Sequence, residues 1–400
     1  MYCTRKISDK ITWIGANDRR PPFFEGTYPV PEGVSYNSYL ISDEKTCLVD
    51  TADKAVAVQF EENLSHALGG RKLDYIFIEH MEPDHCAVLS YVLKEHPEAT
   101  VYASQMAIMM VKQFFDIDIS GRSVAVKDGS ILDLGTSRIT FYSAPMVHWP
   151  EVMVGFMAPD NVLFSADAFG TFGCLDGSIF SDDIDFERDW LPEGRRYYCN
   201  IVGKYGQQTA ALLAKVAKLD VSMICPLHGP VIREDIGRFV DKYSKWASYE
   251  PEEKGVLIAF ASVYGDTKNA AEILAGKLYD QGVKNTVIYD VSITHPSYIL
   301  AEAFRMSNIV LASTTYNTEI FETMQPVIHD FKAHMLRNRC FSIIENGSWA
   351  PNSGALMKKE IESLPCSKII GPEITIKSAL KESQLPDIEK LSENIAASMK

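Results

Sequence analysis

The chain has 400 residues, of which 46% are hydrophobic and 23% are charged. This composition is typical of globular proteins and excludes disordered and fibrous architectures, and the length fits two or three domains. Acidic residues outnumber basic ones by 53 to 39, which gives a formal net charge of −14. Because nucleic acids and anionic membranes attract basic surfaces, the charge argues against either as a partner.

No apolar run approaches the length of about 18 residues that a membrane-spanning helix needs. The first residues, Met1 to Lys6, lead into mixed polar sequence and not into the apolar core of a signal peptide. The eight cysteines are scattered and form no Cys-x-x-Cys pair, which excludes a built-in iron–sulfur module. We therefore expect reduced thiols and a cytoplasmic protein.

The first 250 residues combine short strands of alternating pattern with few helices. Strands are predicted at 38–48 and 138–143, and helices at 56–68 and 106–115. Crowded short strands with few helices favour an α+β layered domain built on antiparallel or mixed sheets. We assign residues 1–250 to this first domain.

A charged, proline-containing segment at 249–254 separates this region from a second one with a different pattern. Strands are predicted there at 255–261, 286–290, 309–313 and 340–344, and helices at 269–279, 298–305, 324–336 and 385–399. Alternating strands and helices predict an open, doubly wound parallel sheet over residues 251–400.

A possible metal site lies in the first region, directly after the apolar run 75–78. The next residues read His80-Met81-Glu82-Pro83-Asp84-His85, and a loop leaving a buried strand holds such ligands on a rigid base. A solvated polar loop is the alternative interpretation of this segment alone. Three more candidate ligands each follow a probable strand: His148, Asp167 and His228. Loops at one sheet edge converge, so the set together predicts a metal centre.

The second region carries three polar loops after its strands. The first follows strand 255–261 and opens a helix, whose free amide groups suit a phosphate; an ordinary strand-to-helix turn is the alternative. The second and third offer an aromatic ring, Tyr316 or Trp349, that can stack on a planar ligand. The candidate residues are Ser262, Tyr264, Gly265, Asp266 and Thr267, then Ser313, Thr314, Thr315, Tyr316 and Asn317, then Asn346, Gly347, Ser348 and Trp349.

The order His-x-Glu-x-Asp-His, then His, Asp and His, resembles the pattern of the metallo-β-lactamase fold. Hydrolases of that superfamily have His at the place of Glu82, whereas the flavodiiron (A-type flavoprotein) family has Glu there. The segments 148–151, 165–170 and 226–230 are also similar to that family, and the loop 262–267 is similar to the phosphate loop of flavodoxins. A carboxylate in place of an imidazole favours iron over zinc.

The resemblance implies a metallo-β-lactamase-like αββα sandwich followed by a flavodoxin-like doubly wound sheet that binds FMN through the three loops. It implies two iron ions, one held by His80, Glu82 and His148 and the other by Asp84, His85 and His228, with Asp167 bridging. In some members of the family the residue corresponding to His85 does not bind metal. The remaining six ligands are the predicted catalytic residues.

The activity implied by the resemblance is reduction of O2 to water or of NO to N2O, with electrons passing from FMN to the iron pair across a head-to-tail homodimer or a dimer of dimers. The external donor is a rubredoxin or reduced coenzyme F420; the sequence leaves both the gas and the donor open. Tyr197 and Tyr198 are candidate proton donors or packing residues. Asp266 stands where the family more often has Asn, and we expect its side chain to turn away from the phosphate.

Three other classes remain to be weighed. A dizinc hydrolase with an accessory flavodoxin-like domain is opposed by Glu82 and by the flavin loops. An electron carrier whose first domain only dimerises is opposed by the ordered set of seven ligand-type residues. A nuclease of the same fold is opposed by the charge of −14.

Overall fold

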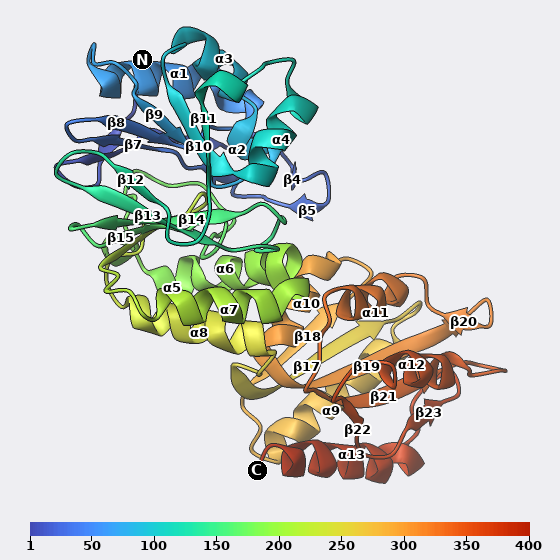
Figure 1. Cartoon of the computed structure of the whole chain (residues 1–400). Helices are drawn as coiled ribbons and strands as arrows, with labels where there is room; N and C mark the ends of the chain where they lie inside the picture. Colours follow the sequence, from blue (N-terminus) through green and yellow to red (C-terminus); the bar gives the residue numbers. More distant parts are fainter. The chain divides into compact units, whose positions relative to one another are not determined.

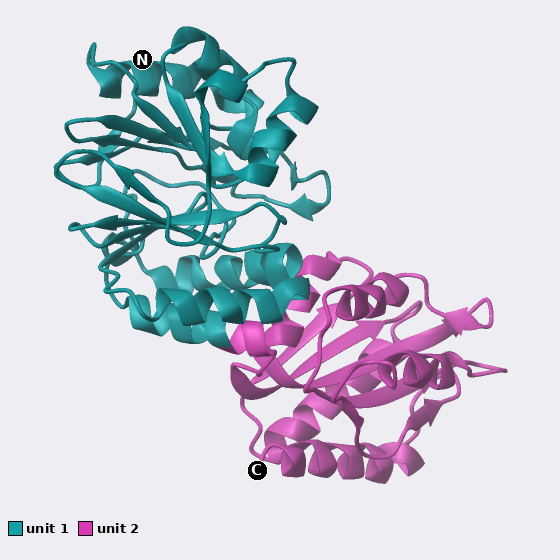
Figure 2. Cartoon of the chain, in the orientation of Figure 1, with its two compact units in different colours: residues 1–244 teal, residues 245–400 magenta.

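The computed structural model describes residues 1–400 as two compact units, residues 1–244 and residues 245–400 (Figure 2). Helix α8 (Ile236–Ser248) contains the boundary between them. No helix combines the length and the apolar composition that crossing a membrane requires. All eight cysteines are free thiols, as the sequence predicts.

Two β-sheets build the first unit. In spatial order the first sheet contains β1 (Arg5–Lys6), β2 (Ile11–Trp13), β7 (Tyr39–Ser42), β8 (Thr46–Val49), β9 (Tyr75–Phe77), β10 (Thr100–Ser104) and β11 (Ser123–Val126). The second contains β12 (Ile131–Asp133), β13 (Arg138–Ser143), β14 (Met153–Ala158), β15 (Val162–Phe164) and β16 (Met223–Cys225). Both sheets mix parallel and antiparallel pairs, as expected of a mixed α+β layer.

Helices cover the outer sides of the two sheets (Figure 1). On one side lie α1 (Ala57–Leu68), α3 (Leu89–Glu95) and α4 (Gln105–Phe114), and on the other α5 (Phe186–Asp189), α6 (Leu191–Tyr197), α7 (Gly206–Val216) and α8. This is the predicted αββα sandwich. Helices α6, α7 and α8 were not predicted, although α8 carries Phe239, Tyr243 and Trp246 at helical spacing.

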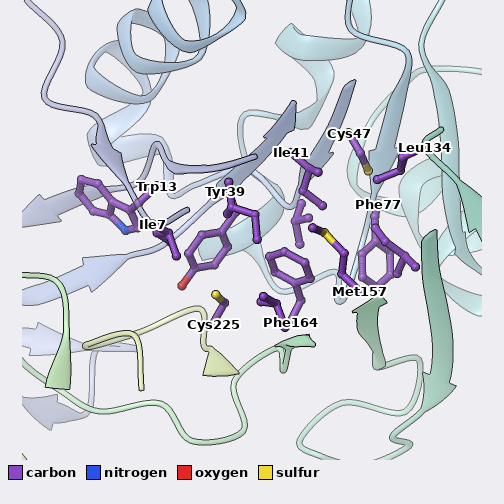
Figure 3. Packing of buried hydrophobic residues seen from close by; sticks show 14 of the residues in the cluster. Ile7, Trp13, Tyr39, Ile41, Cys47, Phe77, Leu134, Met157, Phe164 and Cys225 are labelled. Atoms are coloured by element: carbon purple, nitrogen blue, oxygen red, sulfur yellow. The ribbon is translucent and has the colours of Figure 1, made fainter. Parts of the chain in front are cut away.

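The core of the unit lies between the facing sheets, where large apolar side chains interlock (Figure 3). Phe77 of β9 and Phe141 of β13 meet edge to face, with ring centres 4.8 Å apart. Gly155 of β14 allows this approach, because a Cβ atom there would lie 2.8 Å from the Phe77 ring. The packing fixes the two sheets against each other and with them the loops at their edges.

The strand predicted at 38–48 is in fact a hairpin, and the single-strand prediction is wrong. Strands β7 and β8 pair antiparallel with Ser42 opposite Thr46, and the intervening residues form the turn. The turn was missed because 38–48 is apolar at both ends, with only Asp43-Glu44-Lys45 marking the reversal. The prediction for β13 is confirmed to the residue.

Two short strand pairs complete the first unit. Strand β3 (Ala16–Asp18) pairs with β6 (Val34–Tyr36), and β4 (Phe23–Phe24) pairs with β5 (Tyr28–Pro29). The β4–β5 hairpin is labelled beside α4 in Figure 1. Its inward residue Phe24 is buried, whereas Phe23 is half exposed.

The second unit is a parallel sheet in the order β18-β17-β19-β21-β22. Its strands are β17 (Glu253–Ala261), β18 (Thr286–Asp290), β19 (Met306–Tyr316), β21 (Cys340–Asn346) and β22 (Lys368–Ile369), with β20 (Glu319–Ile320) beside β19 and β23 (Ile374–Ile376) beside β21. All four predicted strands are present. The chain starts at β17, adds β18 on one side and then places β19, β21 and β22 on the other side. This change of direction between β17 and β19 is the flavodoxin-like arrangement, which leaves a crevice at the carboxyl ends of these strands.

The helices of this unit are α9 (Asp266–Asp280), α10 (Pro296–Arg305), α11 (Met324–Ala333), α12 (Ser353–Ile361) and α13 (Leu385–Ser398). Four of them match predicted helices, and α12 was not predicted. Helices α9 and α13 pack against one face of the sheet through residues such as Leu274 and Leu391. The predicted doubly wound fold is therefore confirmed.

Candidate metal centre and flavin site

Loops at the carboxyl ends of four strands carry the candidate metal ligands. His80 and its neighbours follow β9, and short helix α2 (Pro83–Cys86) begins immediately after Glu82. In the second sheet, β13 and β15 are both antiparallel to β14, and β16 is parallel to β15. The loops that carry His148, Asp167 and His228 therefore leave the same edge of that sheet.

Four side chains converge on a first position: His80, Glu82, His148 and Asp167. The Nε2 atom of His148 lies 2.8 Å from Oε2 of Glu82 and 3.0 Å from Oδ2 of Asp167. The Nε2 atom of His80 lies 3.2 Å from the same Glu82 oxygen. Two ligands at right angles around an ion about 2.1 Å away are about 3.0 Å apart, so this spacing fits a transition metal.

A second position is surrounded by Asp84, His85 and His228. The two imidazoles face each other with their Nε2 atoms 3.1 Å apart, and Oδ2 of Asp84 lies 3.4 Å from His85 and 3.2 Å from His228. The other oxygen of Asp167, Oδ1, lies 3.1 Å from Nε2 of His85. One carboxylate thus faces both positions, and the His85 ring points into the second position.

Several of these atoms are buried without a hydrogen-bond partner. They are Nε2 of His80, both carboxylate oxygens of Asp84 and Oδ1 of Asp167. Burying a polar atom without a partner costs about 1–3 kcal/mol each, so converging orphan atoms of this kind need a cation to satisfy them. The donor set of imidazoles and carboxylates therefore fits two transition-metal ions.

The electrostatics of the cluster favour a positive charge at its centre. Burial alone would lower the pKa of His80, but Asp167 and Glu82 outweigh it and raise the pKa to about 9. Burial opposes ionisation of Asp167, yet the surrounding histidines hold the pKa of that carboxyl well below its usual range. A bound metal would take over the charge that these protons carry.

A second layer of contacts orients the ligands. The His228 ring places Nδ1 2.7 Å from the main-chain oxygen of Ser35, which leaves Nε2 free for the metal position. Buried Glu79 accepts a hydrogen bond from the amide of Ala166, next to Asp167, at 2.8 Å. Glu151 accepts one from the amide of Met81 at 2.9 Å. These bonds hold the ligand loops in position without a metal.

Aromatic rings close the site on one side. Phe24 meets the His228 ring edge to face at 5.4 Å, and Tyr197 lies 5.5 Å from the same ring. The Tyr197 side chain is fully buried and its hydroxyl has no hydrogen-bond partner. Glu25, on the adjoining turn, is exposed, yet desolvation of its carboxyl and the neighbouring carboxyl of Glu82 raise the pKa of Glu25 to about 8. Glu25 lies in no recognisable sequence motif and was not among the predicted site residues.

The second unit has a cavity of about 370 Å³ at the carboxyl edge of its sheet. Its walls comprise Ser262, Val263, Tyr264, Asp266, Thr267, Thr314, Thr315, Tyr316, Asn317, Thr318, Asn346, Gly347, Ser348, Trp349, Ala350 and Ser378. All three predicted loops meet here. Ser378 was missed, although its position just after β23 at the same edge was a usable signal.

Of the predicted flavin residues, Gly265 and Ser313 are absent from the cavity walls. Ser313 is fully buried, and its hydroxyl accepts a hydrogen bond from the amide of Phe321, so it supports the loop and does not line the cavity. Asp266 is exposed among the cavity residues at the first position of α9, and that its side chain turns away from a bound phosphate stays a prediction.

The cavity fits a flavin mononucleotide. The first hydrogen bond of α9 runs from the amide of Asn269 to the oxygen of Gly265. The amides that precede Asn269 in the first turn therefore have no helical partner and are free to bind a phosphate in the cavity. Gly265 has a φ of +102°, which glycine adopts without strain. Tyr264 is 95% exposed and Trp349 is 91% exposed, so both rings are available to stack on a planar ligand.

Residues 34–229 match the family model described as ODP family beta lactamase. An anaerobic nitric oxide reductase flavorubredoxin from Vibrio vulnificus is 32% identical over 359 residues, covering 88% of this chain and 71% of the relative. Rubredoxin oxygen:oxidoreductase from Desulfovibrio gigas superimposes with a TM-score of 0.92 at 26% identity, over 99% of this chain and 98% of that one. The chain belongs to the flavodiiron protein family.

The flavodiiron fold extends over both units. The flavodiiron protein from Giardia intestinalis, at 21% identity, shares the fold with a TM-score of 0.92 over 99% of this chain and 97% of that one. Membership of the family makes the chain an oxidoreductase. It also agrees with the two sites: a ligand cluster in the sandwich unit and a flavin-sized cavity in the parallel-sheet unit.

Proposed function

We propose that this flavodiiron protein holds two iron ions around Asp167 and FMN in the cavity of the second unit, and reduces O2 to water or NO to N2O. The observation that carries the proposal is the placement of Asp167, whose Oδ2 faces one ligand group and whose Oδ1 faces the other. The proposal assigns the metal to residues 1–250 and FMN to residues 251–400.

Iron is favoured over zinc by the donor set. The cluster contains three carboxylates, from Glu82, Asp84 and Asp167, beside four imidazoles. Hard oxygen donors and negative charge stabilise a ferric ion more than they stabilise zinc, which has no redox chemistry. The alternative of a dizinc hydrolase therefore fits this site less well.

Two bound iron ions supply reducing centres and open positions for a diatomic gas. The protein's own contribution is to hold His228 through Ser35, to exclude water with Phe24, and to place Tyr197 beside the site. Burial raises the pKa of Tyr197 well above its usual value, so its hydroxyl stays protonated and free to donate. We assign this hydroxyl as the hydrogen-bond or proton donor to the bound gas.

We further propose that FMN stacks against Trp349 and Tyr264 and receives electrons from a rubredoxin or from reduced coenzyme F420 in the cytoplasm. The names of the Desulfovibrio and Vibrio relatives refer to rubredoxin, which makes it the first donor to test. The exposed rings at the cavity mouth leave apolar surface for a second copy of the chain. A head-to-tail homodimer, or a dimer of dimers, brings the flavin of one copy to the iron pair of the other.

Mixed dimers test the head-to-tail arrangement. An Asp84→Asn variant, deficient in metal, is mixed with a Ser262→Asp variant, deficient in flavin, and the subunits are exchanged. Random exchange makes half of the dimers mixed, each with one working pair, so about a quarter of the wild-type activity returns if electrons cross between subunits. No recovery, with exchange verified by sedimentation, would contradict the arrangement.

The reaction itself is tested after anaerobic purification. Iron, zinc and FMN contents are measured first, and consumption of O2 and of NO is then followed with reduced rubredoxin. Two irons and one FMN per chain with turnover of either gas support the proposal, and the larger kcat/KM identifies the substrate. Zinc in place of iron, or no turnover of either gas with reduced rubredoxin and, in a repeat assay, with reduced coenzyme F420, would refute it.

A further inference from the structure

The end of β6 and its connection to β7 fix the loop that carries His228. That loop follows β16 in the second sheet, so the two segments come from different parts of the sandwich. The main-chain amide of Asn37 donates a hydrogen bond to the main-chain oxygen of Leu227 at 2.7 Å. The amide of Gly229 donates one to the Ser35 hydroxyl, also at 2.7 Å. The residues on both sides of His228 are therefore bound to this part of the first sheet.

The side chain of Asn37 makes further bonds to the same loop. Its nitrogen Nδ2 donates to the main-chain oxygen of Pro226 at 2.9 Å and to that of Gly229 at 2.8 Å. Its oxygen Oδ1 accepts a hydrogen bond from the indole nitrogen of Trp13 at 2.8 Å. Since the indole can only donate and the two carbonyls can only accept, these partners fix which end of the Asn37 amide points to the loop.

The position suits asparagine because it needs one acceptor and two donors in the interior. Asn37 and His228 are both fully buried, so water does not replace a lost partner. Aspartate has the same shape but no donor, and its oxygens would face two carbonyl oxygens. Alanine would leave the Trp13 indole and the Gly229 carbonyl without these hydrogen bonds. The amide of Asn37 is therefore specific to the loop that it holds.

The fixed loop determines where the His228 ring points. Nδ1 of the ring lies 2.7 Å from the main-chain oxygen of Ser35. Nε2 lies 3.1 Å from Nε2 of His85 and 3.2 Å from Oδ2 of Asp84. Of the two ligand groups, His228 belongs only to the second, with Asp84 and His85. A shift of the loop would therefore move a ligand of the second metal position.

We propose that Asn37 is a positioning residue for the second metal position, where its amide holds the loop 226–229 and with it the His228 ring. This inference rests on the proposed diiron function. Ligands that are already in place need no rearrangement when the ion binds, so a residue that holds them contributes to metal affinity. Asn37 makes no hydrogen bond to the loops of the other ligands. The two ions should therefore differ in their dependence on Asn37.

The test measures ferrous-ion binding to the metal-free protein by anaerobic competition with a chromogenic chelator. Asn37→Asp keeps the shape of the side chain and removes both donors. We expect it to bind one of the two ions about tenfold or more weakly and the other with the wild-type affinity. Ser35→Ala removes only the acceptor for the Gly229 amide and should weaken the same ion by a smaller factor. This milder variant decides the question if Asn37→Asp does not fold.

Thr46→Val is the matched control for the loss of buried hydrogen bonds. Thr46 is fully buried, and its hydroxyl donates to the main-chain oxygen of Lys72 at 2.6 Å and accepts from the amide of Asp74 at 2.9 Å. It begins β8, which is parallel to β9, so it lies at the sheet edge opposite to the metal loops. The control should lower the melting temperature and leave the affinity for both ions unchanged.

A spectrum separates a positioning role from a general loss of stability. With one cobalt ion per chain, Asn37→Asp should give the same visible spectrum as His228→Ala, which lacks the ligand, because both hold the ion in the first position. Wild-type affinity for both ions in Asn37→Asp and Ser35→Ala, or equal weakening of both ions, would overturn the inference. Failure of the wild type to bind two ions would instead refute the proposed function.

Discussion

Replacing Asp266 by Asn should make the flavin site bind FMN more tightly. Asp266 is the first residue of α9 and is exposed among the residues of the cavity, next to the amides that suit a phosphate. Its carboxylate and the phosphate of FMN are both negative, so they repel each other. The amide of Asn keeps the size of the side chain and removes the repulsion.

The magnitude follows from Coulomb's law. At a separation of about 6 Å and an effective dielectric constant of about 60, a carboxylate and a doubly charged phosphate repel by about 1.8 kcal/mol. Screening at physiological ionic strength, with a Debye length of about 8 Å, reduces this to about 0.9 kcal/mol. The Kd for FMN should therefore fall about fivefold, and about tenfold at low salt.

Fluorescence titration of the flavin-free protein measures this change. Riboflavin, which lacks the phosphate, should bind Asp266→Asn and the wild type equally. Asp280→Asn, at the far end of the same helix, is the control substitution and should leave both affinities unchanged. An unchanged Kd for FMN, an equal gain for riboflavin, or no dependence on salt would refute the electrostatic reasoning.

Three further predictions concern stability and turnover. Burial raises the pKa of Asp43, but hydrogen bonds from Ser137 and Thr136 outweigh it and lower the pKa from 3.8 to about 2. The ionised carboxylate therefore stabilises the fold by about 2 kcal/mol above pH 4, and this stabilisation is lost as the pH falls towards 2. In urea unfolding, the free energy of unfolding of Asp43→Asn should not show this decrease between pH 4 and pH 2, and a decrease equal to that of the wild type would contradict the prediction. Gly155→Ala should lower the free energy of unfolding by about 1–3 kcal/mol, because the new methyl group meets Phe77 at 2.8 Å; thermal unfolding measures this, and a neutral result would mean that the sheets separate easily. Tyr197→Phe should slow gas consumption about tenfold at unchanged iron and FMN contents, while stabilising the protein by about 1 kcal/mol because it removes a buried hydroxyl without a partner; wild-type turnover would exclude the assigned donor.

Much of the second unit could be predicted from the sequence. Strand β18 and the starts of α11, α13 and β21 agree with the predicted boundaries to the residue. The central strands β17, β19 and β21 were recognisable because parallel strands buried on both faces are continuous apolar runs. The first unit was less predictable. Its strands are short, and the hairpin of β7 and β8 read as one strand, since three polar residues were the only sign of its turn.

The candidate ligands were likewise visible in the sequence, because each follows a strand end and carries a side chain suited to metal. The distances between their side chains could not be predicted from the sequence. That Asp167 faces both ligand groups, and that the His85 ring points to His228, depend on how two sheets pack and how their loops meet. Side-chain direction at a converging loop is set by such contacts and not by the order of residues.

The sequence by itself determined the two fold classes and the chemical types of the site residues, since these follow from local pattern and composition. Only the tertiary structure placed Phe24 against the His228 ring and buried Ser313 below the cavity walls. Phe24 belongs to no motif and is far from His228 along the chain, and the two rings meet because the β4–β5 hairpin docks there. Contacts between distant segments depend on packing in three dimensions, which local sequence patterns do not encode.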